Sequence, residues 1–462
     1  MKRFLKIAIP LLILTAGLLV GCHFLFIRSH TITFESNGGT PVDSLTLRFG
    51  TPMSAPAEPT KEGEIFCGWY QDAELTRYYD FVFMGASDLV LYAAWSSPGL
   101  AFALNGNQTG YVVSLGDARA TGRVVIPAEH EGLPVTAVAE NGFRDHSTLE
   151  EVYLPDTVET IGTYAFYSCQ RLSFIRLSAS LRTIGPRAFE GCEALLSPDF
   201  PASLRTVSGY AFADCVALDS LVFPEGLETI AEFAFQGCSG IAEIVLPGSL
   251  QSIGRSAFSG CWGLVDLTLP FIGESRTATA VRGNLGFIFG VTEYAGSSRI
   301  VQYYSAEQTT AYYVPNSLQH LILTEGETLP FGAFSACISL VSVLLPEELT
   351  TVPGFAFFNC YFVSDLVLPA GVTAIGDYAF YGCLTLSGQP LPASLSTLGT
   401  YAFAECTGLV SVFLPASLET MGKDAFSLCT AVSFRSAALE QPASWDAGWN
   451  PAERPVTWGA LE

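Results

Sequence analysis

The repeating pattern of this chain is clearest in residues 149–169, which read LEEVYLPDTVETIGTYAFYSC. Phenylalanine recurs at the position of Phe166 with a step of 23 residues, in a first series and then a second. Alanine precedes it in ten of eleven copies, and cysteine follows three residues later in ten, with His146 replacing the first cysteine. The eleven positions are Phe143, Phe166, Phe189, Phe212, Phe235, Phe258, Phe334, Phe357, Phe380, Phe403 and Phe426. A fixed period of this length indicates units that stack on one another.

Each unit combines a short strand, a turn and a bulky core residue. Val152 and Leu154 alternate with outward positions, so both face one side of a strand. Pro155 ends that strand because proline cannot donate to a continuing ladder. Gly162 is expected to allow a tight bend, and Phe166 to stack on its equivalents in neighbouring coils. One unit cannot bury this apolar face by itself, so the units must form a solenoid with a parallel sheet.

These motifs resemble the leucine-rich repeats of BspA-like (Treponema-type) bacterial surface proteins, over about two-thirds of the chain. The resemblance implies a curved, right-handed, extracellular solenoid with a role in attachment to host or neighbouring cells, but it implies no particular ligand. We therefore predict a mainly β fold. It consists of a leucine-rich repeat solenoid of about twelve 23-residue coils with a parallel sheet, preceded by a small β-grasp-like domain.

Residues 31–96 are predicted to form the small domain, because short aromatic-rich strands alternate there with turn signals such as Asn37-Gly38-Gly39. The stretches FESNGG (34–39), GWY (68–70) and LYAAW (91–95) resemble the internalin-type B-repeat, also called the Listeria–Bacteroides repeat. The resemblance implies a compact β-grasp-like module that serves bacterial surface proteins as a spacer or adhesive unit. We expect Trp69 and Trp95 to be core residues of this module.

The other boundaries follow from where the repeat starts, pauses and decays. They are 1–30 for a signal peptide or membrane anchor, 97–123 for a linker and N-terminal cap, 124–270 for a first bank of repeats, 271–314 for an insertion, 315–435 for a second bank and 436–462 for a C-terminal cap. Trp445, Trp449 and Trp458 are expected to cover the last phenylalanine. The insertion is either a folded excursion that splits the solenoid into two banks or a binding loop.

The N-terminus has the features of an export signal. Lys2, Arg3 and Lys6 precede an uncharged apolar run from 7 to 27. Leu19-Val20-Gly21-Cys22 resembles the bacterial lipobox, which implies cleavage before Cys22 and lipidation of its thiol. Two alternatives remain, an uncut single-pass anchor and a released secreted form, because the apolar run continues past Cys22 to Ile27 and the uncut segment has about the length of a bilayer span. The prediction is an extracellular protein that is anchored to the membrane at the bacterial cell surface.

The charge balance and the missing motifs argue against several classes of function. Asp and Glu number 44 against 22 Lys and Arg, so the net charge is −22, which disfavours nucleic acid as a partner. The chain has only five histidines and lacks a phosphate loop, a His-Glu-x-x-His motif and a Gly-x-Ser-x-Gly motif. We predict no enzyme activity, no catalytic residues, no metal site and no cofactor, with a hydrolase site in the insertion as a remote alternative.

Ten cysteines form a column three residues after the repeated phenylalanines, five in each series. They lack the close pairs of a zinc site. Five cannot pair completely, and a free cysteine behaves as a small buried hydrophobe. We therefore predict buried, unpaired thiols.

The residue between the two inward positions of each strand must point outward. In the later coils this column is mostly apolar, whereas its first members, Tyr153, Arg176 and Asp199, are polar or amphipathic. The predicted partner-binding residues are Val222, Val245, Ile322, Leu344, Val367 and Phe413. There are two alternatives to a binding surface. The outward residues are apolar only because β-branched side chains suit a sheet, or the insertion folds over this column.

The preferred function is a cell-surface binding or adhesion protein that presents its solenoid to a protein or glycan on host or neighbouring cells. A structural spacer of the envelope without a specific ligand is the main alternative.

Overall fold

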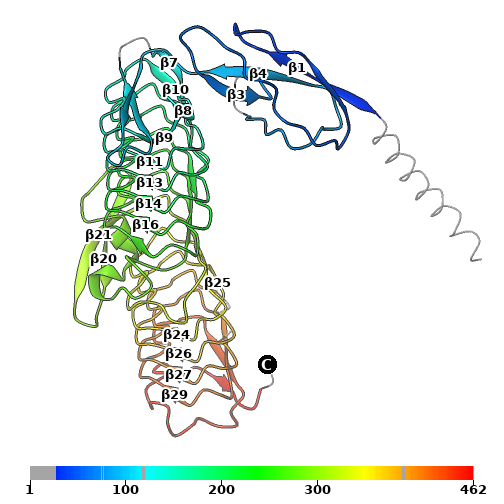
Figure 1. Ribbon diagram of the computed structural model, residues 1–462. Coiled ribbons are helices and arrows are strands. Elements are labelled where there is room, and N and C mark those ends of the chain that lie inside the picture. The colour runs from blue at the N-terminus through cyan, green and yellow to red at the C-terminus, as the bar shows by residue number, and fades with distance from the viewer. Residues whose placement is uncertain (1–27, 74, 76, 117–119, 388–390, 461–462) are drawn as a thin grey trace, which may run out of the picture.

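The computed structural model describes residues 28–73, 75, 77–116, 120–387 and 391–460, so Cys22 lies outside the described part. These residues form a small β domain followed by a long stack of coils, which Figure 1 shows from the side. The helical elements among them are two 3-10 turns, η1 (Ala280–Arg282) and η2 (Leu285–Ile288), and the other elements are strands. The predicted mainly β solenoid is confirmed.

The N-terminal domain is a four-stranded sheet with the order β2-β1-β4-β3. Its strands are β1 (Ser29–Glu35), β2 (Leu45–Arg48), β3 (Phe66–Tyr70) and β4 (Leu89–Trp95). β1 runs parallel to β4, and the two edge strands are antiparallel to their neighbours. Trp69 and Trp95 are buried beside Phe34, so their predicted core placement is confirmed.

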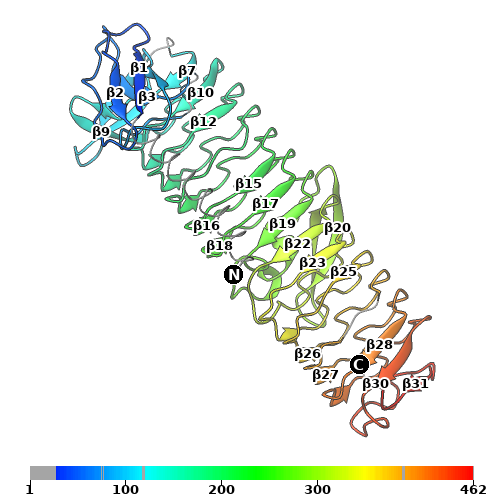
Figure 2. The same cartoon turned by 90° about the vertical axis from the view of Figure 1, so that its right-hand side faces the viewer.

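The longer strands of the coils form a first ladder of parallel pairs, which is seen face-on in Figure 2. It is divided into three sheets, where the sequence predicted one. The first sheet has β7 (Gly122–Val125), β10 (Leu149–Tyr153) and β12 (Phe174–Arg176); the central sheet has β15 (Ser220–Val222), β17 (Glu243–Val245), β19 (Asp266–Leu269), β22 (His320–Leu323), β23 (Ser342–Leu344) and β25 (Asp365–Leu366); the last has β28 (Ser411–Leu414), β30 (Ser433–Ser436) and β31 (Val456–Thr457). The first break lies between β12 and β15, where one coil contributes no strand to this ladder. Pro198 occupies the central strand position of that coil, and it breaks the ladder because proline has no N–H to donate.

A second ladder runs along another side of the coils (Figure 1). One sheet contains β5 (Leu100–Leu104), β6 (Tyr111–Leu115), β8 (Glu129–His130), β9 (Leu133–Val138), β11 (Thr160–Ile161), β13 (Thr183–Ile184), β14 (Thr206–Val207), β16 (Thr229–Ile230) and β18 (Ser252–Ile253), and another contains β24 (Thr351–Val352), β26 (Ala374–Ile375), β27 (Thr397–Leu398) and β29 (Thr420–Met421). The sequence did not predict this ladder, because most of its strands have two residues and show no readable alternation.

The repeated phenylalanines form two stacks in the core, one from Phe143 to Phe258 and one from Phe334 to Phe426. Rings in consecutive coils are nearly parallel, and their centroids lie between 4.9 Å, for Phe380 and Phe403, and 5.7 Å, for Phe235 and Phe258. All of them are fully buried. Since each ring inside a stack contacts the ring of the coil before and of the coil after, the stacks couple the units energetically.

The column cysteines are free and buried, as predicted. The thiol of Cys169 donates to the carbonyl oxygen of Phe143 in the preceding coil at 3.0 Å, and Cys192 and Cys215 repeat this contact with Phe166 and Phe189. Burial raises the pKa of the Cys169 thiol to about 12, which keeps it protonated and able to donate. The column therefore satisfies a row of buried carbonyls as well as filling space.

Gly162 serves a different purpose from the one predicted. Its φ is not positive, but a Cβ at this position would lie 2.7 Å from the backbone nitrogen of Glu140 in the preceding coil. Glycine is thus required by the close approach of two coils. The left-handed backbone of the turn falls instead on Tyr164, with φ of 54°, where an L residue is disfavoured sterically.

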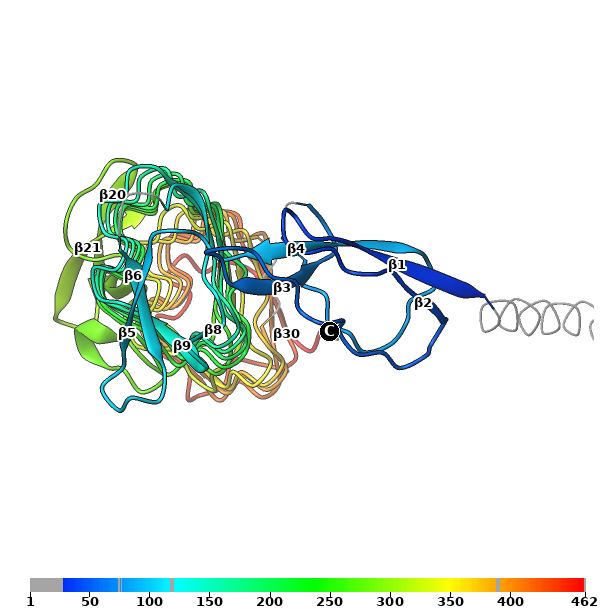
Figure 3. The ribbon, with the colours of Figure 1, turned by 45° about the horizontal axis from the view of Figure 1, so that its top comes forward.

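The insertion leaves the first ladder intact and interrupts the second. β19 pairs directly with β22, placing Thr268 opposite Ile322. The second ladder stops at β18 and resumes at β24. Between them the chain forms a hairpin of β20 (Ser297–Tyr303) and β21 (Thr309–Pro315). Figure 3, which looks toward the N-terminal end of the coils, shows this hairpin on the side away from the N-terminal domain. The insertion is a folded excursion that divides one ladder only.

Part of the insertion continues the core of the solenoid. The backbone nitrogen of Phe258 donates to the carbonyl oxygen of Ile288 at 2.9 Å, just as that of Phe166 donates to Ala188 at 2.7 Å in an ordinary coil. The next residue, Phe289, is fully buried like the repeated phenylalanines. Residues 288 and 289 therefore take the place of the Ala-Phe pair of a missing coil.

Tryptophan closes the C-terminal end of the stack. Trp449 packs edge-on against Phe434 at 5.1 Å and Phe426 at 6.4 Å, and Trp445 packs against Trp449. Both tryptophans are buried. Trp449 therefore covers Phe426, the last phenylalanine of the stack, as predicted. This cover shields core residues that an open end of the solenoid would expose to water.

Candidate binding surface

Four of the six predicted partner-binding residues project well into solvent from the first ladder. Val222 is 54% exposed, Ile322 40%, Leu344 59% and Val367 65%, while Val245 is half-buried. The residues that precede them, Leu221, Ile244, Leu321, Val343 and Leu366, are buried in the core. The period-two alternation thus assigns the inward and outward positions correctly.

The central sheet brings these residues into one row, which we name the apolar stripe: Val222, Val245, Ile322, Leu344 and Val367. The first four are in register on neighbouring strands, with Thr268 between Val245 and Ile322, and Val367 directly follows β25. Phe413 is not part of it, because β28 belongs to the last sheet, and there the guanidinium of Arg435 lies over the half-buried Phe413 ring. The stripe remains exposed with the insertion in place, so the insertion does not fold over it.

A row of polar residues lies beside the stripe. The outward positions two residues earlier carry Ser220, Glu243, Asp266, His320, Ser342 and Asp365. The acidic members Glu243, Asp266 and Asp365 are exposed, and no outward position from β15 to β25 carries Lys or Arg. The surface is therefore apolar along one row and polar, in part acidic, along the next.

The N-terminal domain covers the beginning of the same outward column. Tyr153 points outward from β10 but is only 3% exposed. A cavity of about 200 Å³ at this junction is lined by Cys67, Tyr70 and Tyr78 on one side and by Tyr153 and Arg176 on the other. Tyr153 thus points outward, as the alternation predicts, but it is buried because a separate domain packs on it.

Backbone contacts hold this junction together. The nitrogen of Ser97 donates to the carbonyl oxygen of Val125 at 3.0 Å, and the nitrogen of Val125 donates to the Ser97 hydroxyl at 2.9 Å. Burial raises the pKa of Tyr70 to about 12, against an opposing effect of Arg176 across the junction. The domain is thus attached by hydrogen bonds between Ser97 and Val125, beside a cavity lined by tyrosines from both sides.

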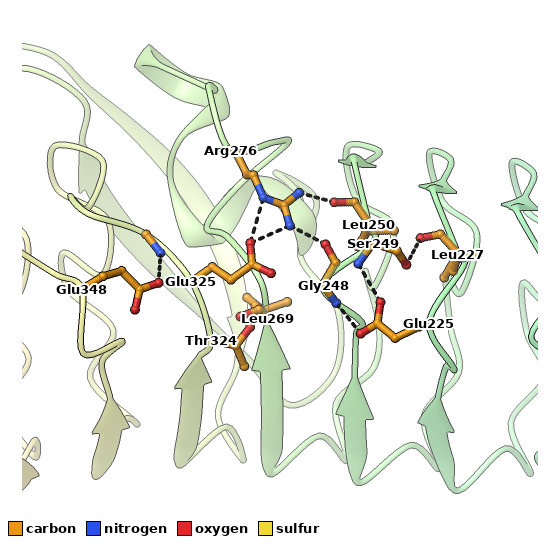
Figure 4. Close-up of polar contacts among 11 residues, drawn as sticks. Glu225, Leu227, Gly248, Ser249, Leu250, Leu269, Arg276, Thr324, Glu325 and Glu348 are labelled. Atoms are coloured by element: carbon orange, nitrogen blue, oxygen red, sulfur yellow. Dashed lines mark hydrogen bonds and ion pairs between the residues drawn. The ribbon is translucent and has the colours of Figure 1, made fainter.

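Carboxylates near the C-terminal ends of the strands accept hydrogen bonds from the backbone of neighbouring coils. Figure 4 shows Glu225 accepting hydrogen bonds from the backbone nitrogens of Gly248 at 3.1 Å and Ser249 at 3.0 Å in the next coil. Glu348 accepts from Gly326 in the same way. Each carboxylate thus stabilises a turn of a neighbouring coil.

Arg276, from the insertion, replaces a contact that serine makes elsewhere. In ordinary coils a serine hydroxyl bonds a carbonyl of the preceding coil, as Ser249 does with Leu227 at 2.9 Å. The guanidinium of Arg276 reaches the carbonyls of Gly248 and Leu250 and pairs with Glu325 at 2.8 Å (Figure 4). A cavity of about 150 Å³ lies beside this ion pair. The sequence offered no signal for this role, because the repeat pattern is absent from the insertion.

Among the described residues, no group of three or more His, Cys, Asp or Glu is placed to hold a metal ion. Within the same part of the chain, no helix is long and apolar enough to cross a membrane.

Comparison with known families agrees with this architecture. The BspA type Leucine rich repeat region matches residues 136–270 and 308–436, which is more than half of the chain. The Listeria-Bacteroides repeat domain matches residues 30–94.

The curated relatives are similar over short segments. A putative membrane protein of Evansella cellulosilytica is 42% identical over 83 residues, 17% of this chain and 12% of that protein. A putative Gly-rich membrane protein of the same organism is 43% identical over 70 residues, 15% of this chain and 8% of that protein. The chain thus matches only a small part of each relative.

Among solved structures, a leucine-rich repeat protein of T. pallidum is 31% identical, covers 37% of this chain and 81% of its own, and has a TM-score of 0.36. A leucine-rich repeat protein of Bacteroides ovatus is 23% identical, covers 78% and 98% respectively, and has a TM-score of 0.44.

Proposed function

Because the chain belongs to the family of BspA-type leucine-rich repeat surface proteins, we propose that it binds a protein partner at the bacterial surface through the apolar stripe. The observation that carries the proposal is the exposure of Val222, Ile322, Leu344 and Val367 in one row on a continuous sheet. Contiguous exposed apolar surface usually marks an interaction site, whereas single exposed apolar residues do not.

Two features of the surface support a protein as the partner: the acidic residues beside the apolar stripe, and the continuation of the outward column to Tyr153. The acidic residues Glu243, Asp266 and Asp365 beside the stripe favour a face with lysine or arginine around apolar side chains. A second copy of this sheet would bring like charges together and is disfavoured. The same outward column already holds a protein domain at Tyr153, so its geometry suits packing against a β surface.

The test is site-specific crosslinking of the full chain on intact bacterial and host cells. A photoreactive residue at position 344 should give a defined product, and the yield should fall as salt concentration rises because of the acidic row. The same probe at Leu439, which is the more exposed of the two sites, is the control. Equal products at both sites, or none at 344, would contradict the proposal and favour a structural spacer of the envelope.

The proposal includes an extracellular location with a lipid anchor on Cys22. Leu19-Val20-Gly21-Cys22 after a basic start motivates it. Mass spectrometry of the native protein should find Cys22 as a lipid-modified N-terminus, and Cys22→Ala should block processing. Recovery of an intact Met1 terminus would refute the lipid anchor and indicate a single-pass anchor.

A further inference from the structure

A groove separate from the apolar stripe lies where three consecutive coils enter the first ladder. It has a volume of about 540 Å³, and we name it the corner groove, defined by its lining residues Asn316, Gln319, Ile338, Ser339, Val341 and Phe362. These residues come just before β22, β23 and β25 in their coils. Three coils at the usual strand spacing extend over about 10 Å, so the groove is long enough for a short chain molecule.

The lining of the corner groove carries no charged side chain. The absence of charge disfavours recognition of an ionic group. Asn316 and Gln319 are exposed, and their side-chain amides make no hydrogen bond within the described residues. An amide both donates and accepts, so these two groups match hydroxyls, which also do both.

Phe362 adds a free aromatic surface. Its side chain is 57% exposed, and its ring is in contact with no other aromatic ring among the described residues. Most other phenylalanines of the coils contact another aromatic ring, as Phe355 and Phe358 contact each other with centroids 5.2 Å apart. Ile338 and Val341 extend the apolar lining beside it. A solvated ring next to unpaired amides offers a stacking surface and hydrogen-bonding groups together.

We propose that the corner groove binds a neutral oligosaccharide. One pyranose ring places its apolar C–H face on Phe362, and the amides of Asn316 and Gln319 exchange hydrogen bonds with the hydroxyls of adjacent sugar units. An extended peptide fits less well, because such ligands pair their backbone with an open strand edge. β22 and β23 are each paired on both sides, so of the three strands at the groove only β25, the last strand of the central sheet, has an edge that a peptide could pair with.

The test is a binding assay of the full chain by saturation-transfer NMR and calorimetry. The probes are the neutral hexasaccharides of chitin, cellulose, xylan and mannan, with hexagalacturonate as a charged comparison and a Gly-Ser-Asn decapeptide as a peptide comparison. At least one neutral probe should bind. Phe362→Ala should weaken that binding about tenfold, in line with the loss of one good stacking contact. Asn316→Ala with Gln319→Ala should weaken it independently.

Phe83→Ala is the matched control, because Phe83 is equally exposed, at 57%, and lies on the N-terminal domain. It should leave sugar binding unchanged, and all variants should keep the parental thermal midpoint. No binding of any neutral probe at millimolar concentration would overturn the proposal, as would binding that Phe362→Ala does not alter. A decapeptide signal that Phe362→Ala removes would assign the groove to peptides and equally overturn it. None of these results depends on the apolar stripe.

Discussion

Leu344→Asp combined with Val367→Asp is expected to weaken binding of the protein partner by at least about 100-fold, which corresponds to about 2.7 kcal/mol. These two side chains are the most exposed members of the apolar stripe, and two carboxylates would bury charge in the interface beside the acidic row. Folding stability should change little, because exposed substitutions usually stay within about 0.5 kcal/mol. Affinity titration against the crosslinked partner and thermal denaturation measure the two effects.

Two control variants separate the effect of added charge from the effect of lost apolar surface. Leu196→Asp with Val216→Asp adds the same charge at exposed solenoid positions outside the stripe, and partner binding should be unchanged. Leu344→Thr with Val367→Thr removes apolar surface while keeping residues that suit a strand, so a smaller loss of affinity is expected. A large drop in the denaturation midpoint of the aspartate double variant would show that these residues are core, and the stripe would then be wrongly assigned.

Phe212→Ala is expected to destabilise the solenoid by about 3–5 kcal/mol. The ring is fully buried and stacks on Phe189 at 5.0 Å and on Phe235 at 5.3 Å, so its removal leaves a cavity shared by three coils. Since each coil is held mainly by its neighbours, the loss should concentrate around residues 189–235. Urea denaturation measures the total change, and amide hydrogen exchange shows where protection is lost.

Phe362→Ala provides the comparison within the same solenoid. The substitution is chemically identical, but this ring is exposed and unstacked, so the stability change should be within about 0.5 kcal/mol. If Phe212→Ala were equally mild, the phenylalanine stack would not couple the coils, and the strand ladders would have to carry the cooperativity alone.

The repeat unit and its core could be predicted from the sequence because the interactions involved are local and repeated. Val152, Leu154 and Phe166 recur with fixed spacing, and a period of 23 residues admits only stacking as a way to bury them. The burial of the cysteine column was predictable for the same reason, and an odd number of thiols per bank excluded complete pairing. The hydrogen bonds that these thiols donate to phenylalanine carbonyls were not, because they depend on the distance between coils.

The sequence by itself therefore determined the solenoid, the inward and outward positions of its strands and the N-terminal β domain. Only the tertiary structure decided which outward positions remain exposed. Tyr153 and Val222 occupy equivalent places in their coils, yet one is covered by a domain about eighty residues away in sequence and the other is open to solvent. Pro198 limits the central sheet, and Arg276 joins the insertion to the turns by contacts that follow no repeat. Burial in the core follows from local periodicity, whereas exposure on the surface depends on what packs against it from distant parts of the chain.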